Sequence, residues 1–183
     1  MTLTCNMATV YIETERLILR SWKDSDKAAF AEMNSNPEVM KYFPAPLSAE
    51  ESNAFIDRIN AEFDATGFGL YAVEIKDTEE FIGYVGFHRF AFDAPFSPNW
   101  EIGWRLSNRY WHKGYATEAA NACIAYARAK RLCPRLYSFT AMPNTPSENV
   151  MLRIGMTFEG TFPHPALPDT HPLKLHKLYS LPL

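Results

Sequence analysis

Gly114 separates an aromatic and basic run, residues 110–113, from an alanine-rich segment over residues 115–131. Alanine is the strongest helix former, and the cations of this segment lie at its far end, where they complement the helix dipole. Predicted strands flank the segment, over residues 100–107 before it and 135–143 after it. The helix is therefore a crossover between two strands, which predicts a mixed α/β fold with helices on both faces of the sheet.

Other periodic segments supply the rest of this fold. Ser48 and Glu51 form a capping box at the start of an amphipathic helix over residues 48–66. Another helix is expected to start at Asp24 or Ser25. The remaining expected elements are strands over 15–22, 68–76, 80–90, 156–160 and 174–181 and a short helix over 145–155. The middle strands form an antiparallel meander, so we expect the sheet to be mostly antiparallel.

The chain of 183 residues is expected to form one domain over 1–183, with residues 1–12 as a flexible N-terminus. Its 47% hydrophobic and 21% charged residues are typical of a soluble globular protein. A formal net charge of −3 predicts no nucleic-acid partner and no membrane partner. The first residues lack the basic start and apolar stretch of a signal peptide, which predicts a cytoplasmic protein.

Cysteines and histidines match no compact metal-site spacing. The cysteines are Cys5, Cys123 and Cys133, and the histidines of the proline-rich segment 162–176 are His164, His171 and His176. We expect the cysteines to be reduced thiols packed as small apolar groups, and we expect no metal. The proline-rich segment is instead typical of a loop on the substrate side.

The loop at Gly114 has the properties of an anion site. The first N–H groups of a helix lack intrahelical partners, and the helix dipole makes that end positive. Gly114 lets a ligand approach the backbone, Ala116 and Thr117 keep the first turn small, and His112 and Lys113 add donors. The alternative is that the glycine only relaxes a turn. Neither G-x-G-x-x-G nor G-K-[ST] is present, so the loop is no dinucleotide fingerprint and no P-loop.

Two blocks of sequence then point to a family. WEIGWRLSNRYWHKGYATEAA matches R/Q-x-x-G-x-G/A at Trp111, Gly114 and Ala116. MPNTPSENVMLRIGMTFEG matches N-x-x-S…K/R-x-G-[FM]-x-x-E-G at Asn144, Ser147, Arg153, Gly155, Met156, Glu159 and Gly160. Together they resemble the GNAT acyltransferases, and within them the RimJ/RimL-like branch, over nearly the whole chain. The branch commonly has a glycine where this chain has His112, a departure that bears on the shape of the loop.

The resemblance implies a single-domain GNAT-like fold with a sheet splayed in the middle, and acetyl-CoA as acyl donor without a metal. The pyrophosphate would bind the backbone amides of residues 112–117, and the pantetheine arm would lie along the strand over 100–107. The implied cofactor-binding residues are Trp104, Arg105, Leu106, Trp111, His112, Lys113, Gly114, Tyr115, Ala116, Thr117, Asn144 and Ser147. The implied reaction is direct attack of a primary amine, in a small molecule or a protein N-terminus, on the thioester, by a monomer or a homodimer.

Candidate catalytic residues follow from the same resemblance. Glu101 is the first candidate for the base; it is alternatively a solvent-facing strand residue, and an ion pair with Arg105 would make its role structural. His88, on the adjacent strand, is the second candidate. Ser147 is the candidate proton donor, with cofactor contact or helix capping as its alternative roles. A non-catalytic acyl-CoA-binding sensor with the same fold stays open as another class of function.

Overall fold

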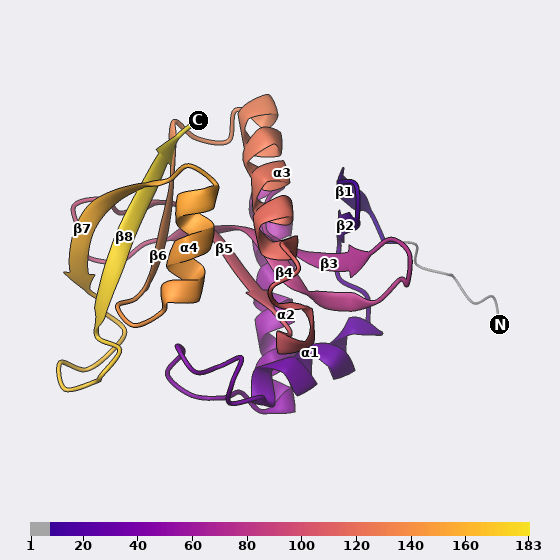
Figure 1. Ribbon diagram of the computed structural model, residues 1–183, viewed down its shortest axis with the longest axis horizontal. Coiled ribbons are helices and arrows are strands. Elements are labelled where there is room, and N and C mark those ends of the chain that lie inside the picture. The colour runs from indigo at the N-terminus through magenta and orange to yellow at the C-terminus, as the bar shows by residue number, and fades with distance from the viewer. Residues whose placement is uncertain (1–7) are drawn as a thin grey trace.

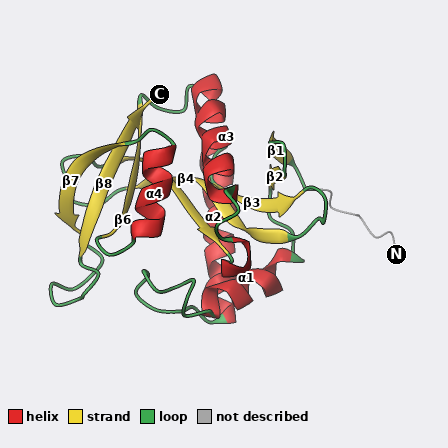
Figure 2. Ribbon diagram, viewed as in Figure 1, coloured by secondary structure: helices red, strands yellow, loops and turns green. Residues whose placement is uncertain are grey.

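The computed structural model describes residues 8–183, and its elements follow the order expected from the sequence, with one additional strand at the N-terminal end (Figures 1 and 2). The strands are β1 (Val10–Glu13), β2 (Leu17–Arg20), β3 (Leu70–Ile75), β4 (Phe81–Phe90), β5 (Asn99–Leu106), β6 (Arg135–Ala141), β7 (Thr157–Pro163) and β8 (Leu175–Pro182). The helices are α1 (Asp26–Ser35), α2 (Ala49–Thr66), α3 (Tyr115–Lys130) and α4 (Thr145–Arg153), with a 3-10 turn η1 (Asn108–Tyr110).

All strands join one eight-stranded sheet in the order β1-β2-β3-β4-β5-β6-β8-β7. Every neighbouring pair is antiparallel except β5 and β6, which are parallel and are connected by the crossover helix α3. The prediction of a mixed, mostly antiparallel sheet in a single-domain α/β fold is confirmed.

The parallel pair is joined only at its beginning. The paired positions are Trp100 with Leu136 and Glu101 with Tyr137. Beyond them β5 stays paired with β4 as far as Leu106, and β6 stays paired with β8 as far as Ala141. The two halves of the sheet therefore diverge, as expected, and leave a gap between the C-terminal parts of β5 and β6.

Helices cover both faces of the sheet (Figures 1 and 2). α3 packs on β4 and β5, and its fully buried Ala120 and Ala127 let the helix approach Ile102 of β5 closely. On the other face Phe30 of α1 and Ile59 of α2 form a smaller core against β4. α4 lies on the same face as α3, over the half of the sheet that contains β6 (Figure 1).

Local sequence signals explain where the helices on the second face begin. The predicted capping box of α2 is confirmed, since the Glu51 N–H donates to the Ser48 hydroxyl at 3.1 Å and the Ser48 N–H donates to the Glu51 carboxylate at 2.8 Å. α1 begins after Ser25, as predicted, but the Ser25 side chain makes no capping bond. The carboxylate of Asp26 accepts the Lys23 N–H at 2.8 Å instead.

β1 corrects the prediction of a flexible N-terminus over residues 1–12 in its last part, residues 10–12, while residues 1–7 lie outside the described residues. Val10 and Ile12 pair with β2, and Ile12 is only 8% exposed. The ring of Tyr11 stacks on Phe63 with centroids 5.4 Å apart. The β-branched and aromatic residues of this short segment therefore extend the sheet by one edge strand. The prediction for Cys5 lies outside the described residues, while Cys123 is a buried thiol and Cys133 a half-buried one.

A buried ionic cluster ties α1 to the sheet. Arg20 of β2 is only 3% exposed, and its guanidinium donates to Asp26 at 2.7 and 2.9 Å and to Glu74 at 2.7 Å. Lys23 adds a second cation to Glu74 at 2.9 Å. Because these groups are removed from water, each charge depends on its partners.

Replacing Asp26 should therefore destabilise the fold strongly. In Asp26→Ala the Arg20 cation stays buried without its bidentate partner, and we expect a loss of about 3 kcal/mol in the free energy of unfolding, measured by urea denaturation. Asp24→Ala is the control, because exposed Asp24 pairs only with Lys27 on the surface and its removal should leave the midpoint nearly unchanged. Equal midpoints for both variants would contradict a structural role for the cluster.

Candidate active site

The loop between η1 and α3 presents unpaired backbone donors. Gly114 is the N-cap residue of α3, with φ of 81°, and it offers no side chain to cap the helix. The first intrahelical bond runs from the Glu118 N–H to the Gly114 carbonyl at 3.0 Å. The N–H groups of Tyr115, Ala116 and Thr117 therefore have no intrahelical acceptor. With the positive end of the helix dipole, these amides form a site for an anion, which we call the amide cradle.

A side-chain clamp fixes the cradle to the start of β2. Arg16 donates from Nη1 to the Lys113 carbonyl at 3.0 Å and from Nε to the Glu118 carboxylate at 2.7 Å. The Thr14 hydroxyl donates to the other Glu118 oxygen at 2.6 Å. The Arg16 guanidinium carbon also lies 4.6 Å from the centre of the Tyr115 ring. Since the clamp uses a carboxylate and a carbonyl, it positions the loop without occupying the amide donors.

His112 occupies a backbone conformation that favours glycine. Its φ is 61°, in the left-handed region, and its side chain is exposed. This is the position at which the sequence resemblance led us to expect a glycine, and its backbone has the conformation that glycine adopts freely. The side chain costs conformational energy here and places an imidazole beside the cradle.

The C-terminal part of β5 offers an open backbone edge to the gap. The Ser107 N–H donates to the Ile82 carbonyl at 2.9 Å, which sets the alternation of β5 against β4. By that alternation the backbone groups of Trp104 and Leu106 point away from β4, into the gap. The Trp111 indole N–H donates to the Leu106 carbonyl at 2.8 Å and so joins the loop to the end of β5. An amide-bearing chain can pair with this edge like an added strand.

Arg105 departs from its expected place in the cofactor contact. Strand alternation directs its backbone to β4 and its side chain to the face of α1 and α2, where it is only 8% exposed. Its Nη1 donates to the Asn34 side-chain oxygen at 2.7 Å, and its guanidinium carbon lies 3.9 Å from the centre of the Phe43 ring. Arg105 therefore braces the segment between α1 and α2 against β5. It forms no ion pair with Glu101 within residues 8–183.

Glu101 lies half-buried on that same face. Burial raises the pKa of its carboxyl to about 8, while His88 opposes the shift and Glu62 adds to it. His88 is directly opposite Glu101 in the register of β4 and β5, and its Nδ1 lies 2.9 Å from Glu62 Oε2. That hydrogen bond raises the pKa of His88. No hydrogen bond among the described residues engages the Glu101 carboxylate, so it can exchange a proton near neutral pH.

The second sequence block places its polar groups at the start of α4. Asn144 caps this helix, because its side-chain oxygen accepts the Ser147 N–H at 3.2 Å and its amide donates to Thr140 at 2.8 Å. Its side chain is thus engaged within the protein, unlike the expected contact with the pantetheine arm. Ser147 is half-buried, and its hydroxyl makes no hydrogen bond to any of residues 8–183. The capping role considered for Ser147 falls to Asn144.

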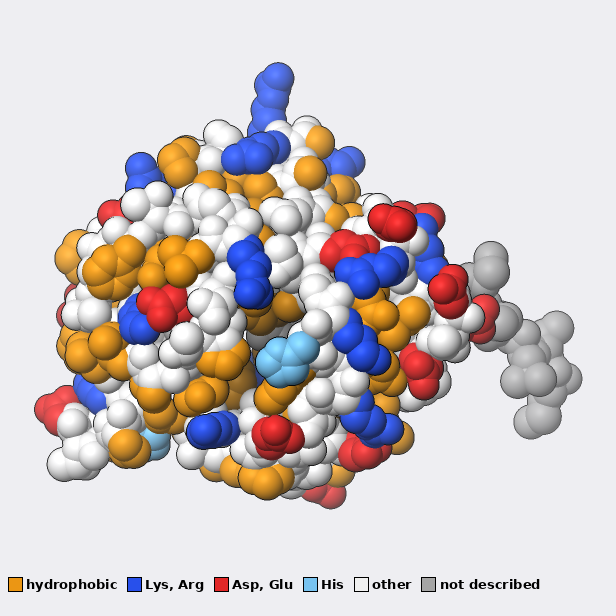
Figure 3. Space-filling model, viewed as in Figure 1, with side chains coloured by type: hydrophobic (Ala, Val, Ile, Leu, Met, Phe, Trp, Pro, Cys, Tyr) orange, Lys and Arg blue, Asp and Glu red, His pale blue; other side chains and the backbone are white. Residues whose placement is uncertain are grey.

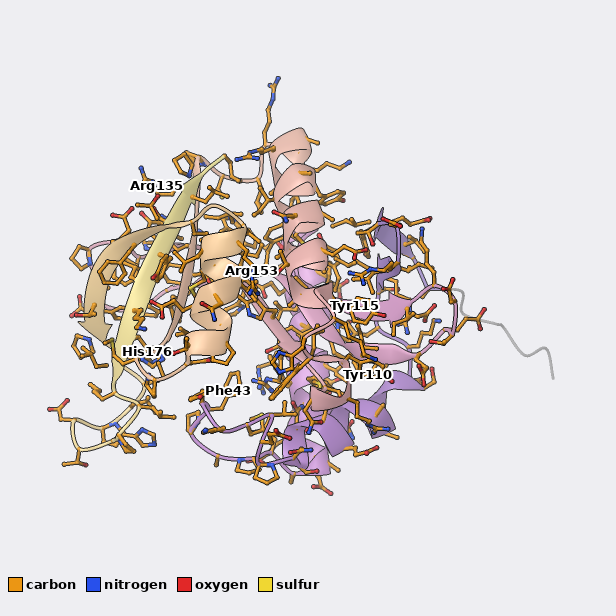
Figure 4. The ribbon with its side chains drawn as sticks, in the orientation of Figure 1. Phe43, Tyr110, Tyr115, Arg135, Arg153 and His176 are labelled. Carbon is orange, nitrogen blue, oxygen red and sulfur yellow. The ribbon has the colours of Figure 1, made fainter. Side chains whose placement is uncertain are left out.

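The amide cradle and the start of α4 border a recess in the surface. Figure 3 shows this face of the molecule hollowed between α3, α4 and the segment that joins α1 to α2. In Figure 4 Arg153 lies between α4 and α3, Tyr115 marks the start of α3, and Phe43 lies across the recess from them. A ligand in the recess would meet the amide cradle on one side and the N-terminal turn of α4 on the other.

Comparison with known proteins identifies the family. The model of the family described as "Acetyltransferase (GNAT) domain" matches residues 16–157, which include Arg16 and Glu118 of the clamp, the cradle and α4. The chain belongs to the GNAT acetyltransferases.

Similar proteins agree with this family. The uncharacterized N-acetyltransferase YnaD of Bacillus subtilis (strain 168) is 34% identical over 154 residues, which cover 84% of this chain and 86% of that protein. A GNAT-family acetyltransferase from Bacillus anthracis is 30% identical, with a TM-score of 0.77 over 96% of this chain and 98% of that one. RimL, a ribosomal L7/L12 alpha-N-protein acetyltransferase, shares the fold with a TM-score of 0.81 over 100% of this chain and 99% of its own, at 16% identity.

GNAT enzymes use acetyl-CoA as acyl donor. The residues present fit this co-substrate: the cradle offers amides to a diphosphate, and the free edge of β5 offers a donor and an acceptor to the pantetheine amides. Among residues 8–183 no three His, Cys, Asp or Glu side chains gather into a metal site, and no helix could cross a membrane.

Replacing His112 should test the strain of the loop. We expect His112→Gly to raise the free energy of unfolding by up to about 1 kcal/mol, because glycine adopts this φ without steric cost. Lys113→Gly is the matched control: Lys113 is equally exposed but has no positive φ, so the added freedom of the unfolded chain should lower stability. Thermal unfolding of both variants would compare them, and a fall for His112→Gly as large as that for Lys113→Gly would contradict the assignment.

The raised pKa of Glu101 predicts a pH-dependent stability. The folded protein retains a proton that an unfolded glutamate, with a pKa of about 4.3, releases. Stability is therefore fully present below that value and is lost as the pH rises towards about 8, the pKa in the folded state. As the pH is raised from 5 to 9, we expect the melting temperature of Glu101→Gln to rise relative to that of the parent. Glu15→Gln, at an exposed position, should show no such trend.

Proposed function

We propose that this GNAT enzyme moves the acetyl group of acetyl-CoA to a primary amine by direct attack, with Glu101 as the base. The observation that carries this proposal is the half-buried carboxyl of Glu101, which has no hydrogen-bonding partner among the described residues and lies at the point where β5 and β6 separate. The amide cradle lies at the other end of the same gap, so a donor anchored there extends toward Glu101.

Different residues bind the diphosphate and the pantetheine arm of acetyl-CoA. The amides of residues 115–117, with Lys113 and His112 beside them, bind the diphosphate, and the backbone of Trp104 and Leu106 orients the pantetheine arm. Trp111 supports this edge through its bond to the Leu106 carbonyl. When bound, acetyl-CoA supplies a thioester carbonyl that an amine can attack.

The chemistry requires a neutral amine and a proton for the departing sulfur. An ammonium of pKa near 8, as in a protein N-terminus, or near 10, as in an alkylamine, gives its proton to the Glu101 carboxylate. The amine nitrogen then bonds to the acetyl carbon while the carbon–sulfur bond breaks. We assign the protonation of the thiolate to the Ser147 hydroxyl, which has no partner among the described residues. Ser147 gives its proton to the sulfur and takes up the second N–H proton that the attacking nitrogen releases. His88, held by Glu62, lies beside Glu101 and can pass the proton to water.

The acceptor is a small-molecule amine or a protein N-terminus, in the manner of the RimJ/RimL-like branch. The two sequence blocks favour that branch, and RimL, whose name states that it acetylates a protein N-terminus, has a closely similar fold. The relatives of higher sequence identity are N-acetyltransferases whose names state no acceptor.

A thiol-release assay tests the proposal. With acetyl-CoA and an alkylamine of pKa near 10, we expect free CoA thiol to form and the rate at fixed amine concentration to rise with pH through about 8, where Glu101 loses its proton. Glu101→Gln should lower kcat by a factor of about 10² or more, and its residual rate should keep rising towards pH 10 with the fraction of neutral amine, instead of levelling off above about pH 8. Ser147→Ala should lower kcat without changing the pH profile.

Glu15→Gln is the control for the loss of a carboxylate and should retain the parent rate. An unchanged rate and pH profile in Glu101→Gln would refute the base assignment. Stabilisation by acetyl-CoA in a thermal shift, without thiol release for any amine, would instead favour a non-catalytic acyl-CoA-binding protein.

A further inference from the structure

The half of the sheet beyond the gap carries an aromatic surface on the face opposite α4. Strand register and ring contacts place its members together: centroids lie 5.5 Å apart for Phe90 and Phe139, 5.0 Å for Phe96 and Phe162, and 5.8 Å for Phe96 and Tyr137. The aromatic surface consists of Phe90, Phe92, Phe96, Tyr137, Phe139 and Phe162. In Figure 1, α1 and α2 lie under the other half of the sheet, away from β6, β8 and β7.

These rings form a cluster that is neither fully buried nor fully exposed. Phe90 is buried, and the other five rings are half-buried. None of them belongs to the strongly exposed large apolar side chains of the described chain, such as Leu152 and Phe158. Ring edges and faces that are partly exposed can stack with a small aromatic ring, whereas a docked second protein would need a broad exposed face.

The aromatic surface is continuous with the proposed base. Glu101 and Tyr137 are paired across β5 and β6, so their side chains lie on the same face, about 5 Å apart at their Cβ atoms. Phe139 follows Tyr137 on that face of β6, and Phe90 contacts both rings. An amine positioned at Glu101 would therefore have its substituent next to these rings.

The charge of the surrounding groups favours an apolar substituent. His164 and His176 border the surface with ring centroids 4.8 Å apart. Burial lowers the pKa of His176 to about 4, and burial and nearby Lys174 lower that of His164, so both rings are neutral at pH 7. The adjacent cation Lys174 is paired with Asp169 at 3.2 Å, so the neutral imidazoles and the rings leave this border without an unpaired negative charge for an additional cation.

We propose that the aromatic surface binds an aromatic ring joined to the acceptor amine by a short aliphatic link, so that the enzyme prefers arylalkylamines to plain alkylamines and polyamines. This inference rests on the proposed function, because it assigns the substituent of the amine that is acetylated. The nitrogen takes the place of sulfur on the acetyl carbon as described above, and the ring contributes only to binding and orientation.

The experiment compares 2-phenylethylamine with ethylamine, which has the same amine without the ring, and with spermidine. At saturating acetyl-CoA we expect kcat/KM for 2-phenylethylamine to exceed the other two by about tenfold or more. Phe162→Thr and, in the loop, Phe96→Ser should reduce that preference at least about fivefold while leaving ethylamine within about twofold.

Phe158→Thr is the matched control. Phe158 lies on the same strand β7 but on the opposite face, where it packs on Tyr179, so its replacement should leave the preference unchanged. Equal kcat/KM for the two monoamines in the parent enzyme, or a preference that survives both substitutions, would overturn the inference and leave acetyl transfer intact.

A binding measurement separates this inference from the proposed function. If no amine releases thiol, the proposed function fails. Line broadening of the 2-phenylethylamine protons in the presence of protein and CoA then shows whether the aromatic surface binds the ring. Broadening that Phe162→Thr abolishes and Phe158→Thr retains would support the ring site, and its absence in the parent would overturn it. A dimer that Phe162→Thr converts to a monomer, seen by light scattering, would also overturn it, since a second copy would then cover the rings.

Discussion

The separation of β5 from β6 is the constraint on which the rest of the molecule depends. Parallel strands that stay paired would bury the edge of β5, whereas here the pairing ends after Glu101 and Tyr137. The backbone of Trp104 is left facing a gap, and the side chain of Glu101 stands at its narrow end on the opposite face of the sheet. The end of this pairing thus leaves a backbone edge of β5 free for a ligand and an ionisable side chain at the start of the gap.

Long-range polar contacts keep that opening rigid. Arg16 and Glu118 hold the cradle, while Arg105 ties α1 to β5 through Asn34 and contacts Phe43 in the segment between α1 and α2. Both contacts join side chains to each other, and neither occupies an amide of the cradle. The protein therefore meets the conformational cost of arranging its donors during folding rather than during binding.

Sequence patterns predicted the features that depend on local spacing. The capping box at Ser48, the crossover helix and the mixed sheet follow from residues close together in the chain. The clamp and the hydrogen bond between Arg105 and Asn34 could not be predicted in this way. Arg16 and Glu118 are 102 residues apart in the sequence, and Arg105 and Asn34 are 71 residues apart. β1 was missed because its four residues form a strand only through pairing with β2 and contact with α2. The partners of Arg105 and Asn144 are likewise set by tertiary contacts, which a strand or helix period does not contain.

The position of β8 has a consequence for synthesis on the ribosome. β8 follows both β6 and β7 in the chain yet lies between them in the sheet. Until its residues have left the exit tunnel, β6 and β7 have no common neighbour, and the edge of each exposes unpaired backbone groups. The N-terminal half, from β1 to β5, can already pair, because each of these strands lies in the sheet beside the strand that precedes it in the chain. The two halves should therefore acquire structure at different times, with the acyl-transfer recess completed only when the later half closes.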